Sequence, residues 1–294
     1  MIEYSEHKIE SGNTKIVLSL WEPKEPEAAI VFIPATMLHS LCYEPLLRGF
    51  AERGYAVAGL HPIGHGKSPR DMGRYTLKDF IQNAYDAVSF MLERYNAPVL
   101  AMGASQGGIV AAGLAAEDDR LAAVFSNNII LSELPDTIKI TRLPKVIRRV
   151  YRLWKKLIKL SAFLLPDLKF PMRTYLDPSR LNIADELFAI FRNDPLCLNK
   201  YPLYFLSSLL NTQLPGITNG SINCPVYIVT DTGDKLFEQE YTQKVFDRLR
   251  APYKELISFH TGGHMFMLTS HDEVCNALAP KIHEAITRVS RQAG

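Results

Sequence analysis

The sequence predicts an α/β protein with a doubly wound, mainly parallel sheet and a helical cap inserted into it. Short apolar runs alternate with helical patterns over residues 28–130 and again over residues 222–290. This alternation is typical of parallel strands covered by helices on both faces. Residues 131–220 interrupt it with helical patterns, several prolines, many aromatic side chains and no clear strand. We therefore expect a core domain, residues 1–130 and 221–294, and a helical cap or lid, residues 131–220.

The expected core strands are short, partly β-branched, and bounded by proline or glycine. These features indicate strands that are buried on both faces. In chain order they cover residues 28–33, 55–60, 98–102, part of 121–130, 225–230 and 253–259. Apolar residues at helical spacing predict helices over residues 41–53, 76–95, 107–116, 238–249 and 272–289. The earlier segment 15–21 is expected to add an antiparallel strand at the edge of the sheet.

Composition and charge exclude several classes of protein. The 294 residues are 47% hydrophobic and 22% charged, which is typical of an ordinary globular protein and not of a disordered or collagen-like chain. With 33 basic and 31 acidic residues the formal charge is only +2, so the charge does not indicate a nucleic-acid partner. The first residues lack the layout of a secretory signal, and no apolar run approaches the roughly 18 residues of a membrane span. We expect a cytoplasmic protein that binds no nucleic acid.

The four cysteines, Cys42, Cys197, Cys224 and Cys275, are far apart in the sequence and form no C-x-x-C pair. Disulfide frameworks and zinc sites require paired or clustered thiols. We therefore expect four reduced cysteines, most of which pack as small hydrophobic side chains. The sequence also shows no metal-ligand cluster and no G-x-G-x-x-G phosphate loop, so no metal and no organic cofactor is expected.

The segment Gly103–Gly108 contains a G-x-S-x-G pattern centred on Ser105. By itself the pattern is weak, but here it lies between an expected strand and an expected helix of small residues, which is the context of a nucleophile elbow. In such an elbow a sharp turn strains the serine backbone, and glycines two positions away on either side prevent collisions. The turn also leaves the amide of Gln106 at a helix N-terminus, where it can stabilise an oxyanion. The alternative is a glycine-rich connection in which Ser105 only caps the helix.

With this elbow the chain resembles the α/β-hydrolase superfamily, nearest to the capped serine esterases, lysophospholipases and monoacylglycerol lipases. The resemblance covers residues 28–128 and 222–290 and is weakest in the cap. It implies a serine, an acid and a histidine that follow one another in this chain order. Residues 60–68 also resemble the D-x-x-G-H-G-x-S loop of the superfamily, with His61 in place of aspartate. We expect this loop to be structural, with His65 satisfying backbone groups.

Two residues in the last quarter of the chain complete the expected triad. His264 ends a glycine-rich segment after the last expected strand, where the superfamily places its catalytic base. The alternative for His264 is a histidine in a surface loop. The acid should follow strand 225–230, where Asp231 and Asp234 are both candidates. The resemblance to the G-x-x-D pattern of the superfamily favours Asp234, which would hold the tautomer of His264 and stabilise the imidazolium.

The loop after the first buried strand is expected to supply the second donor of an oxyanion hole. Many members of the superfamily carry His-Gly there, whereas this chain has Pro34, Ala35, Thr36 and Met37. The resemblance implies that the backbone amides of Thr36 and Gln106 hold the oxyanion. Ala35 and Met37 are expected to contact the substrate.

Residues 145–160 of the cap form a basic amphipathic pattern. Seven Lys and Arg side chains and no acid occur over residues 145–159, with apolar side chains interleaved at helical spacing. Such a helix can lie on an anionic membrane surface. The alternative is a helix that buries its apolar face over the active site and exposes its basic face to solvent. In either case we expect the aromatic cap, Trp154 included, to enclose an apolar acyl pocket.

Together these residues predict a serine hydrolase that cleaves carboxylic esters with apolar acyl groups, such as acylglycerols or lysolipids. The same triad would also serve a thioesterase, an amidase or aminopeptidase, or an acyltransferase, because a fold does not determine the substrate. The departure at Pro34 and Ala35 leaves a cofactor-free lyase on the same fold as another alternative. A hydrolase scaffold that only binds a partner belongs to a different class. The combination of serine, acid and histidine favours the enzyme over such a binding module.

Overall fold

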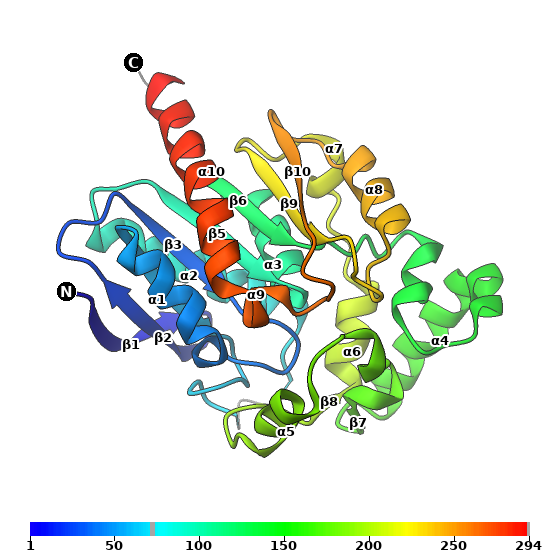
Figure 1. The fold of residues 1–294 in the computed structure, drawn as a ribbon. Coiled ribbons are helices and arrows are strands. Elements are labelled where there is room, and N and C mark those ends of the chain that lie inside the picture. The colour runs from blue at the N-terminus through cyan, green and yellow to red at the C-terminus, as the bar shows by residue number, and fades with distance from the viewer. Residues whose placement is uncertain (71–73, 293–294) are drawn as a thin grey trace.

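An eight-stranded sheet forms the centre of the computed structural model, which describes residues 1–70 and 74–292 (Figure 1). The strand order is β1-β2-β4-β3-β5-β6-β9-β10. The strands are β1 (Glu3–Ser11), β2 (Thr14–Glu22), β3 (Ala28–Ile33), β4 (Tyr55–His61), β5 (Val99–Ala104), β6 (Leu121–Asn127), β9 (Val226–Asp231) and β10 (Lys254–Phe259). From β4 to β10 every neighbouring pair is parallel, whereas β2 pairs antiparallel with both β1 and β4. The prediction of a doubly wound, mainly parallel sheet is thus confirmed.

The parallel strands are buried on both faces, as their apolar sequences predict. Every residue of β3, β4, β5, β6 and β9 is buried. Side chains that alternate along a strand point to opposite faces, so one strand contributes to two hydrophobic cores. Along β3, Ile30 and Phe32 belong to one core, while Val31 and Ile33 belong to the other.

Helices cover both faces of the sheet (Figure 1). On one face, α1 (Glu44–Glu52) packs against α10 (His271–Gln292). On the other face, α2 (Leu77–Arg94) packs against α3 (Gln106–Ala115), and α8 (Gln239–Arg248) contributes to the same core. This two-sided covering explains why the central strands carry almost no polar side chains.

The prediction that segment 15–21 forms the edge of the sheet is wrong. The segment lies in β2, and β1 pairs with β2 along its whole length, from Glu3 opposite Glu22 to Ser11 opposite Thr14. Sequence analysis missed β1 because most of its residues are polar and either exposed or half-buried. An edge strand tolerates such charges since one side of it meets solvent, and the charges also hinder pairing with other molecules.

Residues 131–220, which we call the cap, lie between β6 and β9 and beside the central sheet (Figure 1). Helices of the cap are α4 (Tyr151–Leu164), α5 (Asp185–Asn193), α6 (Leu203–Asn211) and the short α7 (Gly216–Asn219). The expectation of a cap without strands is wrong, because β7 (Lys169–Pro171) pairs antiparallel with β8 (Lys200–Pro202). Each strand has three residues, which is too short for a period of two to be recognised.

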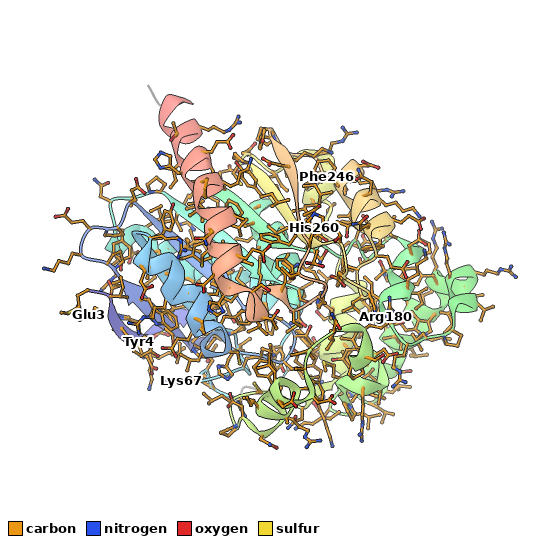
Figure 2. All side chains as sticks on the ribbon, in the orientation of Figure 1. Glu3, Tyr4, Lys67, Arg180, Phe246 and His260 are labelled. Carbon is orange, nitrogen blue, oxygen red and sulfur yellow. The ribbon has the colours of Figure 1, made fainter. Side chains whose placement is uncertain are left out.

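Short helices connect the longer elements. They are α9 (Phe266–Thr269) and the 3-10 helices η1 (Ser40–Tyr43), η2 (Pro135–Ile140), η3 (Lys145–Val150), η4 (Met172–Thr174) and η5 (Pro178–Arg180). Arg180, labelled in Figure 2, binds the cap to the loop that follows β9. Its guanidinium donates to the carbonyl of Lys139 over 2.6 Å and to the carbonyl of Lys235 over 2.7 Å. Because Lys235 directly follows Asp234, this contact places the cap against the loop in which the acid is expected.

Candidate active site

Ser105 lies in the turn between β5 and α3, with φ +51° and ψ −112°. This positive φ is strained for a residue with a side chain, as expected for a nucleophile elbow. At Gly103 and Gly107, two positions before and after Ser105, there is no room for a side chain. A Cβ atom on Gly103 would lie 2.1 Å from the carbonyl oxygen of Gly107, and one on Gly107 would lie 2.1 Å from the carbonyl oxygen of Ile33. The G-x-S-x-G pattern therefore follows from the close approach of strand, turn and helix.

His264 lies between Ser105 and Asp234 in a continuous hydrogen-bonded chain. Its Nε2 is 2.9 Å from Ser105 Oγ, and its Nδ1 is 2.7 Å from Asp234 Oδ2. The Nδ1 proton faces a carboxylate, so Nδ1–H donates to Asp234 and Nε2 accepts from the serine hydroxyl. The imidazole is 2% exposed and stacks on Phe237 at 5.4 Å. The structure thus brings together the serine, acid and histidine that the sequence predicted, in a geometry that suits proton transfer from Ser105.

Asp234 and Asp231 differ in their hydrogen-bond partners. Asp234 Oδ1 accepts from the backbone amides of Leu236 and Phe237, whereas Oδ2 accepts from His264 and from the side-chain amide of Asn128. No hydrogen bond between Asp231 and His264 is found among the described residues. Its carboxylate accepts from the amides of Thr261 and Gly262 and from the Thr261 hydroxyl. Asp231 therefore joins the end of β9 to the loop that carries His264.

The loop after β3 approaches the start of α3, as the predicted oxyanion hole requires. Gln106 is the first residue of α3, where a backbone amide has no acceptor inside the helix. The Thr36 hydroxyl donates to Gln106 Oε1 over 3.2 Å, which joins the two segments. Met37 has φ +64°, and its amide donates to the hydroxyl of Tyr201 over 2.9 Å. The amide of Met37 is therefore occupied, and the assignment of Thr36 and Gln106 as oxyanion donors stays a prediction.

Tyr201, in β8 of the cap, was not identified from the sequence. Its hydroxyl lies 2.7 Å from Nε2 of His65, whose Nδ1–H donates to the carbonyl of Ile63 over 3.0 Å. Burial lowers the pKa of His65 to about 4, so the neutral ring accepts the Tyr201 proton at Nε2. The hydroxyl that donates to His65 then accepts from the Met37 amide. A cap residue thereby holds the loop that carries Thr36. No local sequence pattern predicts this contact.

Two adjoining cavities of about 380 Å³ and 260 Å³ meet at Ser105. The larger cavity is lined by His264 and by Ala35 and Met37, the two residues expected to contact substrate. The smaller cavity is lined by Gln106 and by Trp154, the predicted substrate contact from the cap. Thr36 and Ser105 line both cavities. Their shared position makes Ser105 the point at which one bound molecule can extend into both spaces.

Comparison with known families matches residues 24–271 to the family described as serine aminopeptidase, S33. The chain belongs to this family. The match covers most of the chain, including the segments that carry Ser105, Asp234 and His264. A comparison with curated protein sequences found no significant match.

Solved structures of other proteins share the fold of this S33-family protein over nearly its whole length. The monoacylglycerol lipase of Paleococcus ferrophilus has a TM-score of 0.68 and 19% identity, over 94% of this chain and 98% of that one. A soluble variant of monoglyceride lipase from Saccharomyces cerevisiae, solved with a substrate analogue, has a TM-score of 0.77 and 14% identity, over 95% of each chain. A thermostable carboxyl esterase from Bacillus coagulans, solved with glycerol, has a TM-score of 0.71 and 16% identity, over 97% of this chain and 100% of that one. The comparisons confirm an α/β-hydrolase with monoacylglycerol lipases among its structural neighbours.

The two cavities of this S33-family protein differ in chemistry. The smaller one is mostly apolar, and α4 and α6 contribute much of its wall. Its apolar lining residues are Ile109, Ile130, Ile140, Leu143, Trp154, Ile158, Phe170, Leu203, Leu206, Leu209, Leu210 and Phe237. The larger cavity includes three exposed cationic residues, Arg173, Arg192 and Lys200. No acidic partner is found for these three side chains within residues 1–70 and 74–292. Within the same ranges, no Asp or Glu lines either cavity.

The basic segment 145–160 is not one continuous helix. Residues 145–150 form η3, and α4 begins only at Tyr151, because Val150 at φ −114° and ψ 22° departs from helical geometry. Trp154 and Ile158 line the apolar cavity, so one side of α4 covers the candidate site. The interpretation that the helix buries its whole apolar face is nevertheless wrong. Large apolar side chains of α4 face solvent, namely Leu153, Leu157, Leu160, Phe163 and Leu164.

Cationic side chains flank these exposed apolar residues on α4. Arg152, Lys156 and Lys159 are exposed, and no acidic partner is found for them in the part of the chain that the structure describes. Among the described residues, no helix combines the length and hydrophobicity that crossing a membrane requires. The outer surface of α4 therefore combines exposed apolar and cationic side chains.

Proposed function

We propose that the protein is a serine hydrolase that cleaves carboxylic esters with an apolar acyl group. The observation that carries the proposal is the position of Ser105, within hydrogen-bond distance of His264 and at the junction of the two cavities. The apolar cavity suits an acyl chain, because burial of each methylene contributes about 0.8 kcal/mol. The larger cavity, with its three cations, suits the polar alcohol part of the substrate.

In the proposed reaction Ser105 attacks the ester carbonyl while His264 Nε2 takes the hydroxyl proton. The amides of Thr36 and Gln106 stabilise the tetrahedral oxyanion, and Asp234 stabilises the imidazolium. His264 then gives the proton to the departing alcohol, and the acyl group stays on Ser105. Water, deprotonated by His264, attacks this acyl-enzyme and releases the carboxylic acid and the free serine.

The cavity linings favour an ester over a peptide with a free amino terminus. An aminopeptidase must hold the ammonium group of its substrate, and a cation taken out of water requires an anionic or strongly polar partner. Neither cavity offers a carboxylate within the described residues. The cations Arg173, Arg192 and Lys200 would repel an ammonium group, whereas they suit a neutral or anionic alcohol part. Acylglycerols and lysolipids are the substrate classes that fit both cavities.

We also propose that α4 brings the protein to an anionic lipid surface. Its exposed apolar side chains would enter the boundary between headgroups and acyl chains, and its cations would pair with anionic headgroups. Phe163 is 81% exposed and Leu157 is 54% exposed. Contact between these apolar side chains and water is unfavourable, and insertion into the lipid would remove it. Because Trp154 and Ile158 of the same helix line the acyl cavity, a lipid substrate would enter beside the surface that holds the enzyme.

Reaction with a fluorophosphonate, followed by intact-mass measurement, tests the chemistry. We expect one covalent adduct on the wild-type protein and none on Ser105→Ala. A folded wild-type protein without an adduct would contradict the proposal and favour a binding module. A series of nitrophenyl esters then tests the acyl preference. Activity should rise from acetate to octanoate, whereas a preference for acetate with a steep loss by octanoate would contradict an apolar acyl pocket.

A further inference from the structure

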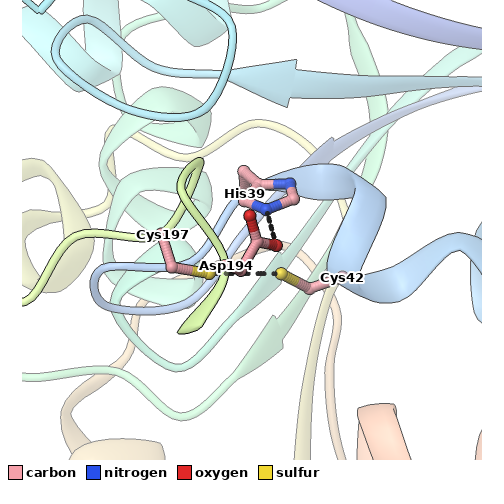
Figure 3. A group of neighbouring side chains, drawn as sticks. All are labelled: His39, Cys42, Asp194 and Cys197. Atoms are coloured by element: carbon pink, nitrogen blue, oxygen red, sulfur yellow. Dashed lines mark hydrogen bonds and ion pairs between the residues drawn. The ribbon is translucent and has the colours of Figure 1, made fainter. Parts of the chain in front are cut away.

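All four cysteines are free, as expected, but Cys42 and Cys197 lie close together. Their Sγ atoms lie 3.7 Å apart, although the residues are separated by 155 positions in the sequence (Figure 3). Cys42 follows the loop that carries Thr36, and Cys197 belongs to the cap. The packing of the cap on the core therefore forms a pair of thiols that linear spacing does not reveal. The other two cysteines, Cys224 and Cys275, are buried elsewhere.

Two further side chains complete this cluster, which consists of His39, Cys42, Asp194 and Cys197 (Figure 3). Nε2 of His39 lies 2.8 Å from Oδ2 of Asp194. The cluster has two halves, His39 with Cys42 and Asp194 with Cys197, and the two residues of each half lie in one turn of the backbone. The amide of Cys42 donates to the carbonyl of His39, and the amide of Cys197 donates to the carbonyl of Asp194, each over 3.1 Å. The sequence thus contains H-x-x-C and D-x-x-C, and each turn presents two donor groups three residues apart.

The four donor groups match the coordination chemistry of zinc. Zinc prefers four ligands from cysteine sulfur, histidine nitrogen and carboxylate oxygen in a tetrahedron. At a Zn–S distance of about 2.3 Å, two thiolates of a tetrahedron lie about 3.8 Å apart. The observed Sγ–Sγ distance is 3.7 Å, and all four donor atoms lie within 4.8 Å of one another. A disulfide, by contrast, requires the two sulfur atoms to approach to about 2.05 Å.

The surroundings of the cluster also suit an ion. His39 is 2% exposed, and its ring interacts with two other members of the cluster, Asp194 and Cys42. The side chain of Asp194 is 26% exposed, which leaves a route to solvent. On binding, the His39–Asp194 hydrogen bond would open by roughly half an ångström to the span of a tetrahedral site. The two thiols would lose their protons to solvent and bind as thiolates.

We propose that His39, Cys42, Asp194 and Cys197 bind one zinc ion that joins the cap to the core. All four positions are filled by protein side chains, which is typical of a structural site rather than a catalytic one. The ion would reinforce the neighbouring hydrogen bond from the Leu198 amide to the Met37 carbonyl, 2.9 Å long. It would thereby hold the cap segment that follows α5 against the loop after β3. This proposal does not depend on ester hydrolysis.

Cobalt titration of the full chain tests the site. The protein is first freed of metal with a chelator and kept reduced with a phosphine. We expect one Co²⁺ per chain, with thiolate-to-cobalt charge-transfer bands and tetrahedral d–d bands, and displacement of the cobalt by Zn²⁺. Zinc should also raise the melting temperature of the reduced wild-type protein, because only the folded state brings all four ligands together. Cys42→Ser and Cys197→Ser should each lose the charge-transfer bands and the thermal shift.

Two variants make the test independent of folding defects. Cys224→Ser removes a buried thiol outside the cluster and should leave the spectrum unchanged. Asp194→Asn removes a ligand charge at a partly exposed position and should weaken cobalt binding by at least roughly 10-fold while the fold persists. A folded, reduced wild-type protein that gives no charge-transfer bands would overturn the proposal. So would peptide mapping that finds a Cys42–Cys197 disulfide in protein whose reduced form binds no cobalt.

Discussion

At the scale of single residues, hydrogen-bond partners separate two carboxylates that the sequence places three positions apart. Asp234 faces His264, whereas Asp231 accepts from the loop that carries His264. Both side chains are buried, so burial does not distinguish them. What distinguishes them is where each carboxylate points: that of Asp234 points to His264, and that of Asp231 points to the backbone of the loop that carries His264. The same local segment therefore supplies one group for the proposed chemistry and one that holds the loop in place.

Replacing each aspartate by asparagine should separate the proposed catalytic role of Asp234 from the structural role of Asp231. Asp234→Asn is expected to lower kcat by roughly 10³- to 10⁴-fold with little change in stability, because His264 loses the tautomer that accepts the serine proton. Asp231→Asn is expected to lower the free energy of unfolding by about 1–3 kcal/mol, since its new N–H donors face backbone amides. Ester kinetics and urea unfolding of both variants measure the difference. An Asp231→Asn variant that keeps its stability but loses activity as fully as Asp234→Asn would reverse the assignment.

Tyr201→Phe should show how the cap supports the loop after β3. Without the hydroxyl, the Met37 amide and His65 Nε2 both lose a buried partner, and we expect a loss of about 1–3 kcal/mol in the free energy of unfolding. Because the loop that carries Thr36 would shift, kcat should fall more than KM rises. Tyr204→Phe is the matched control, since no hydrogen bond of the Tyr204 hydroxyl is found within the described residues. Equal effects of the two substitutions would refute the role of Tyr201.

At the scale of secondary structure, α4 and α6 form much of the wall of the smaller, apolar cavity. Both helices contact each other and direct apolar side chains into the smaller cavity. Only one side of α4 does so, and its other apolar residues face solvent. The two sides of one helix therefore lead to two separate predictions, one for substrate size and one for lipid binding.

Leu210→Trp should shorten the preferred acyl chain. Leu210 of α6 lines the apolar cavity, and a larger side chain there would remove space for about two methylenes, or roughly 1.6 kcal/mol of burial. The ratio of octanoate to acetate activity should then fall by about 15-fold. Leu164→Trp places the same side chain on the exposed side of α4 and should leave the ratio unchanged. An unchanged ratio in Leu210→Trp would mean that the acyl chain binds elsewhere.

Replacing Leu157 and Leu160 together by glutamate should abolish binding to anionic vesicles. Each leucine that enters the interface contributes about 1.5–3 kcal/mol, and the new charges are repelled by the lipid, so binding should weaken more than 10-fold. Cosedimentation with phosphatidylserine-containing vesicles measures it, while hydrolysis of a short soluble ester should persist. Ile190→Glu, at an exposed apolar residue of α5, is the control. Undiminished vesicle binding by the double variant would exclude α4 as the lipid-binding surface.

At the scale of the whole molecule, the buried histidines His61 and His65 link stability to pH. Burial lowers the pKa of His61 to about 3 and that of His65 to about 4, both below the ordinary value of 6.5. Between about pH 6.5 and pH 4, the unfolded chain therefore binds protons at these two histidines, whereas the folded protein does not. Stability present above pH 6.5 is lost as the pH falls toward 4.

Urea unfolding at about pH 7 and about pH 5 should reveal this loss. Each of the two histidines contributes up to about 1.4 kcal/mol per pH unit below its unfolded pKa. His65→Gln should reduce the slope of stability against pH by about half, whereas His283→Gln, at an exposed position, should not change it. A wild-type protein equally stable at both pH values would show that the two rings are not neutral and buried in solution.

The sequence by itself determined the central architecture and the position of the elbow. Runs of apolar residues predict the parallel strands since each strand must be buried on both faces. The elbow at Ser105 is local as well, because a strand, two glycines and a helix within a few residues require that turn. The exposed strand β1 and the three-residue strands of the cap were not predictable, because an edge position or a short length removes the periodic signal.

Only the tertiary structure decided which distant side chains meet. It separated Asp234 from Asp231, brought Tyr201 to His65, and placed Cys197 beside Cys42. None of these contacts follows from local preference, because each joins residues far apart in sequence, and the contacts of Tyr201 and Cys197 depend on how the cap packs on the core. Local sequence determines the elements, and the burial of their apolar faces determines which functional groups they bring together.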